Sequence, residues 1–139
     1  MQHYTTIEQT KKLVELGLNP DTADMHYSML YNRGIDGGGK SLSDFPTILK
    51  PIGIEDMPCW SLGALISLMP NKLENLSTPN TSVWLEIGNR IVEYRRQSNM
   101  DQSTLNNDEM PSFRGADLIT NAFDMVCWLI EGNYIEKGE

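Results

Sequence analysis

Cysteine, positive charge and long apolar runs are all scarce in this chain of 139 residues. The two cysteines, Cys59 and Cys127, are too few for a disulfide scaffold or a cysteine-based zinc site. Each precedes a tryptophan within an apolar stretch, which predicts a buried free thiol. No apolar run approaches the roughly 18 residues that cross a bilayer, and the first residues, MQHYTTIEQTKK, lack the apolar core of a signal peptide. We therefore expect a cytoplasmic protein without a membrane segment.

Basic residues are outnumbered, with 11 against 19 acidic residues, and the net charge is −8. Nucleic-acid binding needs clustered Lys and Arg that displace counterions, so this balance argues against such a partner. The one dense basic spot is Arg90 with Arg95 and Arg96. The acidic residues are spread along the chain rather than gathered in a block, and solubility accounts for them.

Side chains typical of catalytic and metal sites are also sparse. His3 and His26 are the only histidines and lie too far apart in sequence to form a metal-binding pair. The aspartates lack the alternate spacing and closing Glu of a calcium loop, and no serine lies in a G-x-S-x-G turn. We therefore expect no catalytic residue, no metal site and no cofactor.

One short segment does match a known chemistry. Residues 34–41, GIDGGGKS, fit the G-x-x-x-x-G-K-[ST] pattern of phosphate-binding loops. Such a loop follows a buried strand and precedes a helix whose N-terminus faces the phosphate. Here the preceding SMLYNR is not a clear buried strand, and Pro46 falls where the helix would be in its second turn. We predict a glycine-rich surface loop.

The alternative function is a small enzyme or nucleotide-binding protein that uses the 34–41 loop or Cys59. Cys59 would lie at the N-terminus of a helix, where the dipole lowers the pKa of a thiol, and His26 would act as its base. Nothing in the sequence brings these two side chains together.

Start and stop signals in the sequence predict the first helix. Thr5 and Glu8 have the spacing of a capping box, and an apolar stripe follows them. Gly17 is the expected left-handed stop, after which Leu18 folds back on the last turn.

Two further helices are predicted. Residues 60–69 form a short, nearly all-apolar helix with Ser61 as its N-cap and Pro70 as its terminator. Residues 116–131 have apolar side chains at the 3, 4 spacing of a buried stripe. Gly132-Asn133 ends this helix.

The clearest strand signal is a hairpin over residues 83–96. A two-residue Gly88-Asn89 turn of type II′ pairs Ile87 with Arg90 and Leu85 with Val92. Because alternate residues share a face, this register defines an inner and an outer face. The inner face carries Val83, Leu85, Ile87, Val92 and Tyr94, and the mostly wet outer face carries Trp84, Glu86, Ile91, Glu93 and Arg95.

These elements predict an α+β fold in which a small antiparallel sheet, the hairpin plus one or two further strands, packs against about three helices. A strand is also expected within 23–31, whereas residues 32–58 should be mostly irregular with one short strand around 47–49. The chain should form a single compact domain, 1–139, with flexible loops at about 32–44 and 97–112.

Four residues are candidates for binding a ligand or partner. Trp84 and Ile91 form an apolar pair beside Arg95 on the outer face of the hairpin, next to a sheet edge. This pattern predicts an association surface and a homo-oligomer. Asp24 is either a turn or cap residue or a polar group that faces a pocket, and we favour the turn or cap.

Three segments together resemble a group of small uncharacterised proteins carried by phages, prophages and other mobile elements of Bacteroidetes and relatives. They are TIEQTKKLVELGLNPDTADM (6–25), MPCWSLGAL (57–65) and WLIEGNYI (128–135), the last with Gly and Asn exchanged. The match covers about half the chain. The resemblance implies a mobile-element setting in the cytoplasm of a bacterial host. We therefore expect a non-enzymatic accessory protein that binds a host protein or a small signalling molecule, as phage-encoded inhibitors of host defence do.

Overall fold

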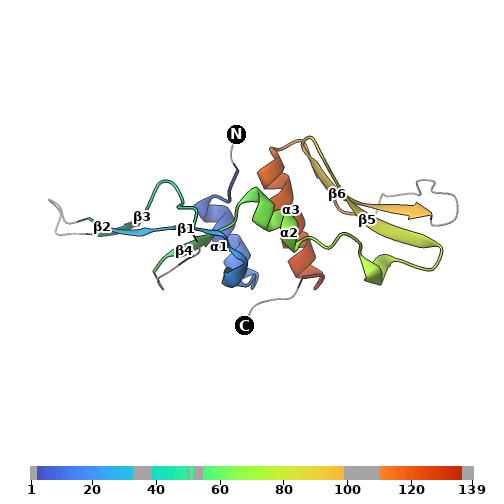
Figure 1. Cartoon of the computed structure of the whole chain (residues 1–139), viewed down its shortest axis with the longest axis horizontal. Helices are drawn as coiled ribbons and strands as arrows, with labels where there is room; N and C mark the ends of the chain where they lie inside the picture. Colours follow the sequence, from blue (N-terminus) through green and yellow to red (C-terminus); the bar gives the residue numbers. More distant parts are fainter. Residues whose placement is uncertain (1–2, 33–38, 50, 52–54, 99–109, 136–139) are drawn as a thin grey trace.

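The computed structural model describes residues 3–32, 39–49, 51, 55–98 and 110–135. It is an elongated α+β molecule with three helices near its middle and β-structure at both ends (Figure 1). The predicted fold class is therefore confirmed. The helices are α1 (Ile7–Glu15), α2 (Leu62–Leu68) and α3 (Leu118–Glu131), with short 3-10 turns at Pro20–Thr22 and Glu74–Leu76. Among the described residues, no helix is long and apolar enough to span a membrane.

Helix α1 begins one residue later than predicted. Thr6, not Thr5, is the N-cap, and its capping box uses Gln9 rather than Glu8. The reason is that the Thr5 hydroxyl is buried and occupied: it lies 2.9 Å from the Thr10 hydroxyl and accepts a hydrogen bond from the Trp60 amide.

The C-terminal end of α1 is as predicted. Gly17 has a φ of 97°, in the left-handed region that glycine favours, and the Leu18 amide donates to the Leu13 carbonyl at 3.0 Å. Leu18 is thereby buried in the core.

Two small antiparallel pairs form the N-terminal β-structure. Strand β1 (Met25–Tyr27) pairs with β4 (Met57–Cys59), and β2 (Met29–Asn32) pairs with β3 (Gly39–Leu42). The expected strand at 23–31 is confirmed as β1 and β2. The expectation of mostly irregular structure over 32–58 is wrong for β3 and β4, and residues 47–49 contribute a single bridge, Thr47 to His26, instead of a strand. Strand β4 pairs with a strand far away in the sequence, which no local pattern reveals, and β3 pairs with its neighbour β2 from a glycine-rich segment that lacks apolar alternation.

The C-terminal sheet has the order β5 (Thr81–Gly88), β6 (Ile91–Ser98), β7 (Ser112–Arg114). Its hairpin turns at Asn89-Arg90 rather than Gly88-Asn89, so Gly88 pairs with Ile91 and Leu85 pairs with Tyr94. A Cβ on Gly88 would lie 2.9 Å from the Ile91 side chain, so this glycine makes room for Ile91. The positive φ falls on Arg90, at 58°.

The two predicted faces of the hairpin survive this change of register. Moving the turn by one residue moves each cross-strand partner by two positions. Because side chains alternate between the two faces, a shift of two positions leaves every residue on its predicted face. Val83, Val92 and Tyr94 are buried on the inner face, in the same core as α3, whereas Ile87, predicted on that face, is 39 % exposed. Glu93, expected on the wet face, is nevertheless buried, for a reason described below.

The large core lies between α2, α3 and the inner face of the β5–β6–β7 sheet. Helix α3 starts at its N-cap Asp117, one residue inside the predicted range, and supplies the largest share of this core. Its buried side chains are those of Ile119, Asn121, Ala122, Met125, Val126, Leu129 and Ile130. A second, smaller cluster joins Met25, Tyr27 and Cys59 beneath α1.

Parts of both predicted loops form strands. Residues 33–38 and 99–109 lie outside the described residues. Residues 39–42 form β3, residues 97 and 98 complete β6, and Ser112 begins β7. The end of α3 is as predicted: Asn133 takes a φ of 62°, and the Tyr134 ring folds back to stack on Trp128 with centroids 5.0 Å apart.

Candidate binding surface

Three of the four candidate residues share one surface, the outer face of the β5–β6–β7 sheet. Trp84 pairs with Arg95 across the hairpin, whereas Ile91 pairs with Gly88, four residues further along each strand. Trp84 and Ile91 therefore share the outer face, but the predicted apolar pair is wrong, because the register differs from the predicted one. The Trp84 side chain is 43 % exposed, and the Lys72 ammonium lies 5.5 Å from the centre of its ring. A cation over an aromatic ring holds the ring in place while leaving its other side accessible.

A charged network covers the sheet beside Trp84. The Glu93 carboxylate accepts hydrogen bonds from Ser112 Oγ at 3.0 Å, Arg114 Nη2 at 3.0 Å and Arg95 Nη1 at 3.4 Å. Arg95 Nε also lies 3.7 Å from a Glu86 carboxylate oxygen. Glu93 is buried because these donors satisfy its charge, and it fixes the positions of both guanidinium groups.

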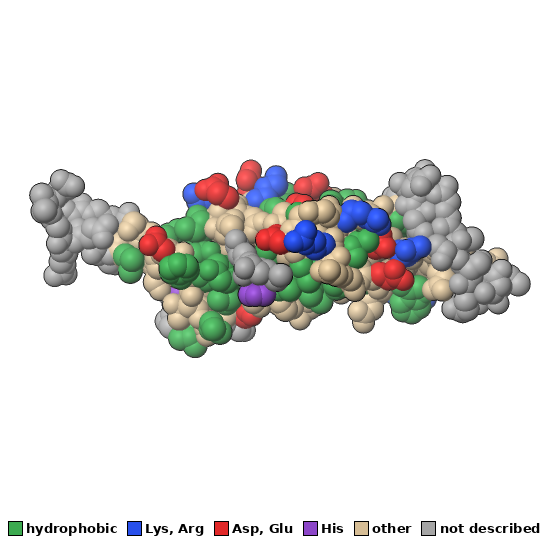
Figure 2. Space-filling view, turned by 90° about the horizontal axis from the view of Figure 1, so that it is seen from above, with side chains coloured by type: hydrophobic (Ala, Val, Ile, Leu, Met, Phe, Trp, Pro, Cys, Tyr) green, Lys and Arg blue, Asp and Glu red, His purple; other side chains and the backbone are tan. Residues whose placement is uncertain are grey.

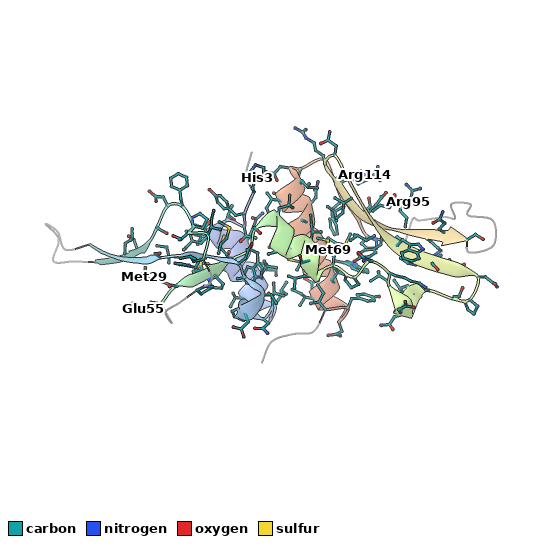
Figure 3. The ribbon with its side chains drawn as sticks, viewed as in Figure 1. His3, Met29, Glu55, Met69, Arg95 and Arg114 are labelled. Carbon is teal, nitrogen blue, oxygen red and sulfur yellow. The ribbon has the colours of Figure 1, made fainter. Side chains whose placement is uncertain are left out.

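The network extends over all three strands and leaves much of each arginine accessible. Figure 3 shows Arg95 and Arg114 on the same side of the sheet. In the view of Figure 2, basic and acidic side chains are interleaved over the C-terminal half, whereas apolar side chains gather over the N-terminal half. The outer face therefore offers an aromatic ring, two oriented guanidinium groups and carboxylates of opposite charge.

Sequence reasoning missed three contributors to this face. Arg114 and Ser112 come from β7, which begins at the last residue of the predicted 97–112 loop and is too short to show an alternation. Lys72 reaches Trp84 from the connection after α2, through an isolated bridge between the two residues. No sequence signal indicates these long-range contacts.

The edges of the hairpin are less available than expected. Along β5, the Leu73 amide donates to Val83 and the Leu85 amide donates to Asn71, both at 2.9 Å. Along β6, β7 pairs with residues 91–93 and the Tyr94 amide donates to Pro111 at 3.1 Å. Of the predicted association surfaces, the face is therefore better exposed than the edges of the hairpin.

Asp24 lies apart from this face and has a structural role. Its carboxylate accepts hydrogen bonds from the Ser61 amide, at 2.9 Å, and from the Ser61 hydroxyl. Ser61 in turn caps α2 by accepting from the Ala64 amide. Asp24 therefore ties the start of α2 to the segment before β1, in agreement with the cap interpretation.

Cys59 and His26 do not form a nucleophile and base. Cys59 is fully buried, and burial raises the pKa of its thiol. Cys59 pairs with Met25 and its neighbour Pro58 pairs with His26, so the two side chains leave the sheet on opposite faces. The His26 Nδ1 atom instead lies 2.8 Å from the Leu49 carbonyl oxygen. Burial also raises the pKa of Cys127, to about 12.

The described part of the glycine-rich segment lacks the setting of a phosphate-binding loop. Lys40 and Ser41 lie in β3, paired antiparallel with β2, where such a loop would begin a helix. Residues 34–38 lie outside the described residues. Within the described ranges, no group of three or more His, Cys, Asp or Glu side chains is placed to hold a metal ion.

No family model matches this sequence, and neither curated proteins nor solved structures show a significant similarity to it. The resemblance to mobile-element proteins therefore stays a prediction. Function is inferred from the residues of this chain and their arrangement.

Proposed function

We propose that this chain is a non-enzymatic accessory protein of a phage or other mobile element, and that it binds a host protein through the outer face of the β5–β6–β7 sheet. The observation that carries the proposal is the half-exposed Trp84, which lies next to Arg95 on a sheet face that also carries the oriented Arg114. Tryptophan and arginine dominate the binding energy of protein interfaces. Inhibition of a host anti-phage defence is the role that the resemblance suggests.

The charges of this face favour a protein partner. Arg95 and Arg114 alternate with Glu86 and Glu93, so the face suits a surface that also carries both signs. Apolar residues surrounded by a polar rim are the usual arrangement of such interfaces. The enzyme alternative has less support, because Cys59 is buried and His26 faces away from it.

The test is capture of host proteins from a bacterial lysate on the immobilised chain, followed by affinity measurement for the captured protein. Trp84→Ala should weaken binding at least 10-fold, because interface hot spots contribute about 2 kcal/mol or more. Leu30→Ala is a matched control, since Leu30 is 47 % exposed but lies on β2. Equal loss in both variants, or no loss in either, would remove the sheet face as the binding surface.

A small signalling molecule is the other ligand class and has its own test. Cyclic dinucleotides, ADP-ribose derivatives and Mg²⁺-nucleotides can be screened by thermal shift. A ligand at 100 times its dissociation constant stabilises the fold by about 2.7 kcal/mol. Stabilisation by one of these ligands, without capture of any host protein, would replace the protein partner in the proposal.

We also propose that the free chain forms a homodimer through the same face, and that the host protein displaces the second copy; charges of both signs allow the face to pair with itself. Light scattering at micromolar concentration should give a dimer mass, and Trp84→Glu should convert it to a monomer mass. A monomer mass for both proteins would remove the homodimer and leave the host-protein proposal standing.

A further inference from the structure

Strand β7 forms an exposed edge of the β5–β6–β7 sheet. It is the last strand in the order of the sheet and pairs with β6 alone. On the opposite side, the backbone of Val83 and Leu85 bonds to the connection after α2, so β5 is largely covered. Ser112 and Arg114, the two ends of β7, are exposed. An exposed edge strand is a template on which another extended segment can pair.

The register shows which backbone groups of β7 point away from the sheet. The Tyr94 amide donates to the Pro111 carbonyl at 3.1 Å, so the backbone groups of Tyr94 point toward β7. Alternate residues of a strand point to the same side, so Val92 also points toward β7 and bonds to its partner Phe113. The two residues that flank Phe113 therefore direct their amides and carbonyls outward.

These flanking residues, Ser112 and Arg114, offer an amide and a carbonyl each. Within the part of the chain that the structure describes, none of these groups has a hydrogen-bond partner. Pro111 has no amide at one end, and Gly115 takes a φ of 92° at the other, which ends the extended conformation. Donors and acceptors that alternate along a short extended stretch are matched by the backbone of another strand.

An added strand would continue the binding face described above. Arg114 lies opposite Ile91, so its side chain and that of Ser112 are on the outer face of the sheet. The Arg114 guanidinium, held by Glu93 at 3.0 Å, is still 64 % exposed and would lie beside the outer side chains of the added strand. The residue between them would lie next to Phe113, which packs against the large core. One partner can therefore contact both the edge and the face.

We propose that an extended segment of the host protein adds to β7 as a further strand, bonded to the backbone of Ser112 and Arg114. The identity of the partner rests on the proposed function, whereas the open edge does not. The segment needs three consecutive extended residues without proline, with an apolar side chain in the middle against Phe113. Backbone bonds supply affinity, and the face of the sheet supplies the remaining contacts. Pairing two copies through three residues each would bury much less surface than a stable interface does.

The first test uses a probe that does not require the host protein, the peptide acetyl-Thr-Val-Thr-Val-Thr-amide, titrated into the ¹⁵N-labelled chain. This peptide is uncharged, so charges of the chain do not drive its binding. At saturation it should shift the amide resonances of Ser112 and Arg114 and slow their hydrogen exchange at least about 10-fold. Exchange of the Phe113 amide, which already bonds to Val92, should not change. The analogue that is methylated at every residue nitrogen has no donors for a strand and should not bind.

Two variants of the chain extend the test to the purified host protein captured in the assay above. Ser112→Pro removes one outward amide and keeps the inward bonds of Phe113, so it should weaken binding of the peptide and of the host protein at least about 10-fold. Ser112→Ala is the matched control: it keeps the amide, loses the bond from Oγ to Glu93, and should weaken binding less than about threefold. Slow exchange of the Phe113 amide in both variants verifies that β6 and β7 remain paired.

Three results would show that β7 is not an open edge for a strand. Slow exchange of the Ser112 and Arg114 amides in the free chain would mean that these amides are already bonded. Absence of peptide binding would remove strand addition. Equal binding of the methylated analogue, or of the peptide to Ser112→Pro, would place the peptide elsewhere.

Other results would overturn the occupant and separate this inference from the proposed function. If Ser112→Pro binds the host protein as well as Ser112→Ala does, while Trp84→Ala weakens binding, the host protein uses the face alone. Peptide binding at the edge without capture of any host protein would remove the proposed function and, with it, the host segment as occupant. A mass of the free chain that Ser112→Pro lowers and Trp84→Glu leaves unchanged would make the occupant a second copy.

Discussion

The two clusters of buried side chains in this molecule are stabilised by different chemistry. The large cluster, between α2, α3 and the β5–β6–β7 sheet, consists almost wholly of apolar side chains in contact. The small cluster, beneath α1, places Cys59 and Tyr27 around a polar group, Thr5. The Tyr27 hydroxyl donates to the Thr5 carbonyl at 2.7 Å, and the Thr5 hydroxyl accepts from the Trp60 amide at 3.1 Å.

This difference shows where each region draws its stability and where it is vulnerable. In the large cluster, the free energy comes from burial and close packing, so the loss of volume should matter most. In the small cluster, fewer apolar groups are buried, and single hydrogen-bonding groups should matter more. The small cluster also continues into an open groove between α1 and strands β2, β3 and β4, whereas the large cluster is covered by α3.

The largest expected effect is a truncation in the large cluster. Leu65→Ala should lower the free energy of unfolding by about 2–5 kcal/mol, because Leu65 is fully buried and its removal leaves a cavity. Urea denaturation followed by circular dichroism measures this change. Leu30→Ala, at a half-exposed position of β2, should change stability by no more than about 0.5 kcal/mol. Similar effects of the two variants would mean that burial does not distinguish the regions.

Removal of a hydroxyl group in the small cluster should have a smaller effect on the free energy of unfolding. Thr5→Val keeps the shape of the side chain but leaves the buried Trp60 amide without its hydroxyl partner, and it should cost about 1–3 kcal/mol. Thr5→Ser keeps the hydroxyl and loses a methyl group, so it should cost about 1 kcal/mol or less. If Val were tolerated better than Ser in the same denaturation assay, the small cluster would depend on burial as the large one does.

Alanine substitutions of two glycines, one in α2 and one at the C-terminal end of α3, should change the stability in opposite directions. A Cβ on Gly63, in α2, would meet its nearest atom at 3.8 Å, so Gly63→Ala should stabilise the chain by about 0.5–1 kcal/mol through helix propensity. A Cβ on Gly132 would lie 2.5 Å from the Tyr134 ring. Gly132→Ala should therefore displace this ring from Trp128 and destabilise by about 0.5–1.5 kcal/mol. Melting temperatures measure the two stability changes, and tryptophan fluorescence reports the displacement of the Tyr134 ring. An unchanged fluorescence spectrum in Gly132→Ala would contradict this displacement.

The two thiols should make the free energy of unfolding depend on pH in the same way for both clusters. This dependence should be absent near neutral pH. Burial raises the pKa of Cys59, in the small cluster, and of Cys127, beside the large one. A group whose pKa is raised by folding contributes stability below its unfolded pKa, about 8.5 for a thiol, and loses it as the pH rises toward the folded value. Stability should therefore be constant from pH 7 to 8 and fall above about pH 9.

Denaturation at pH 7 and pH 10 measures this loss. Cys59→Ala should reduce the difference between the two pH values, and iodoacetamide at pH 8 should modify neither thiol of the folded chain within the time that modifies both in urea. Rapid modification of Cys59 in the folded chain would show a reactive thiol and support the enzyme alternative.

Much of the C-terminal region could be predicted from the sequence, because its signals are local. The apolar spacing within 116–131 describes α3, and the alternation of β5 and β6 assigns each residue to its face. The exact turn could not be predicted, because Gly88 makes room for the Ile91 side chain and the positive φ falls on Arg90, which is not a glycine.

The N-terminal region could be predicted far less well, because its strands depend on distant partners. Strand β4 pairs with β1 across more than 25 residues, and β3 begins in a glycine-rich segment with no alternation of apolar residues. The same limit applies to the candidate sites. The sequence placed Trp84, Ile91 and Arg95 on one face, but the network around Glu93 needs Arg114 from β7, and the open edge of the sheet is β7 itself.

The position of α3 in the chain has a consequence for the order in which the protein folds during synthesis. All the side chains of the small cluster are made once the ribosome has passed Cys59, whereas the large cluster needs Ile130, about 70 residues later. At about 5–20 residues per second, this interval lasts about 4–14 s. During that time the inner face of the hairpin and the apolar side of α2 have no α3 to cover them. A nascent chain halted before α3 should therefore bind chaperones that recognise apolar surface, and release them when α3 is added.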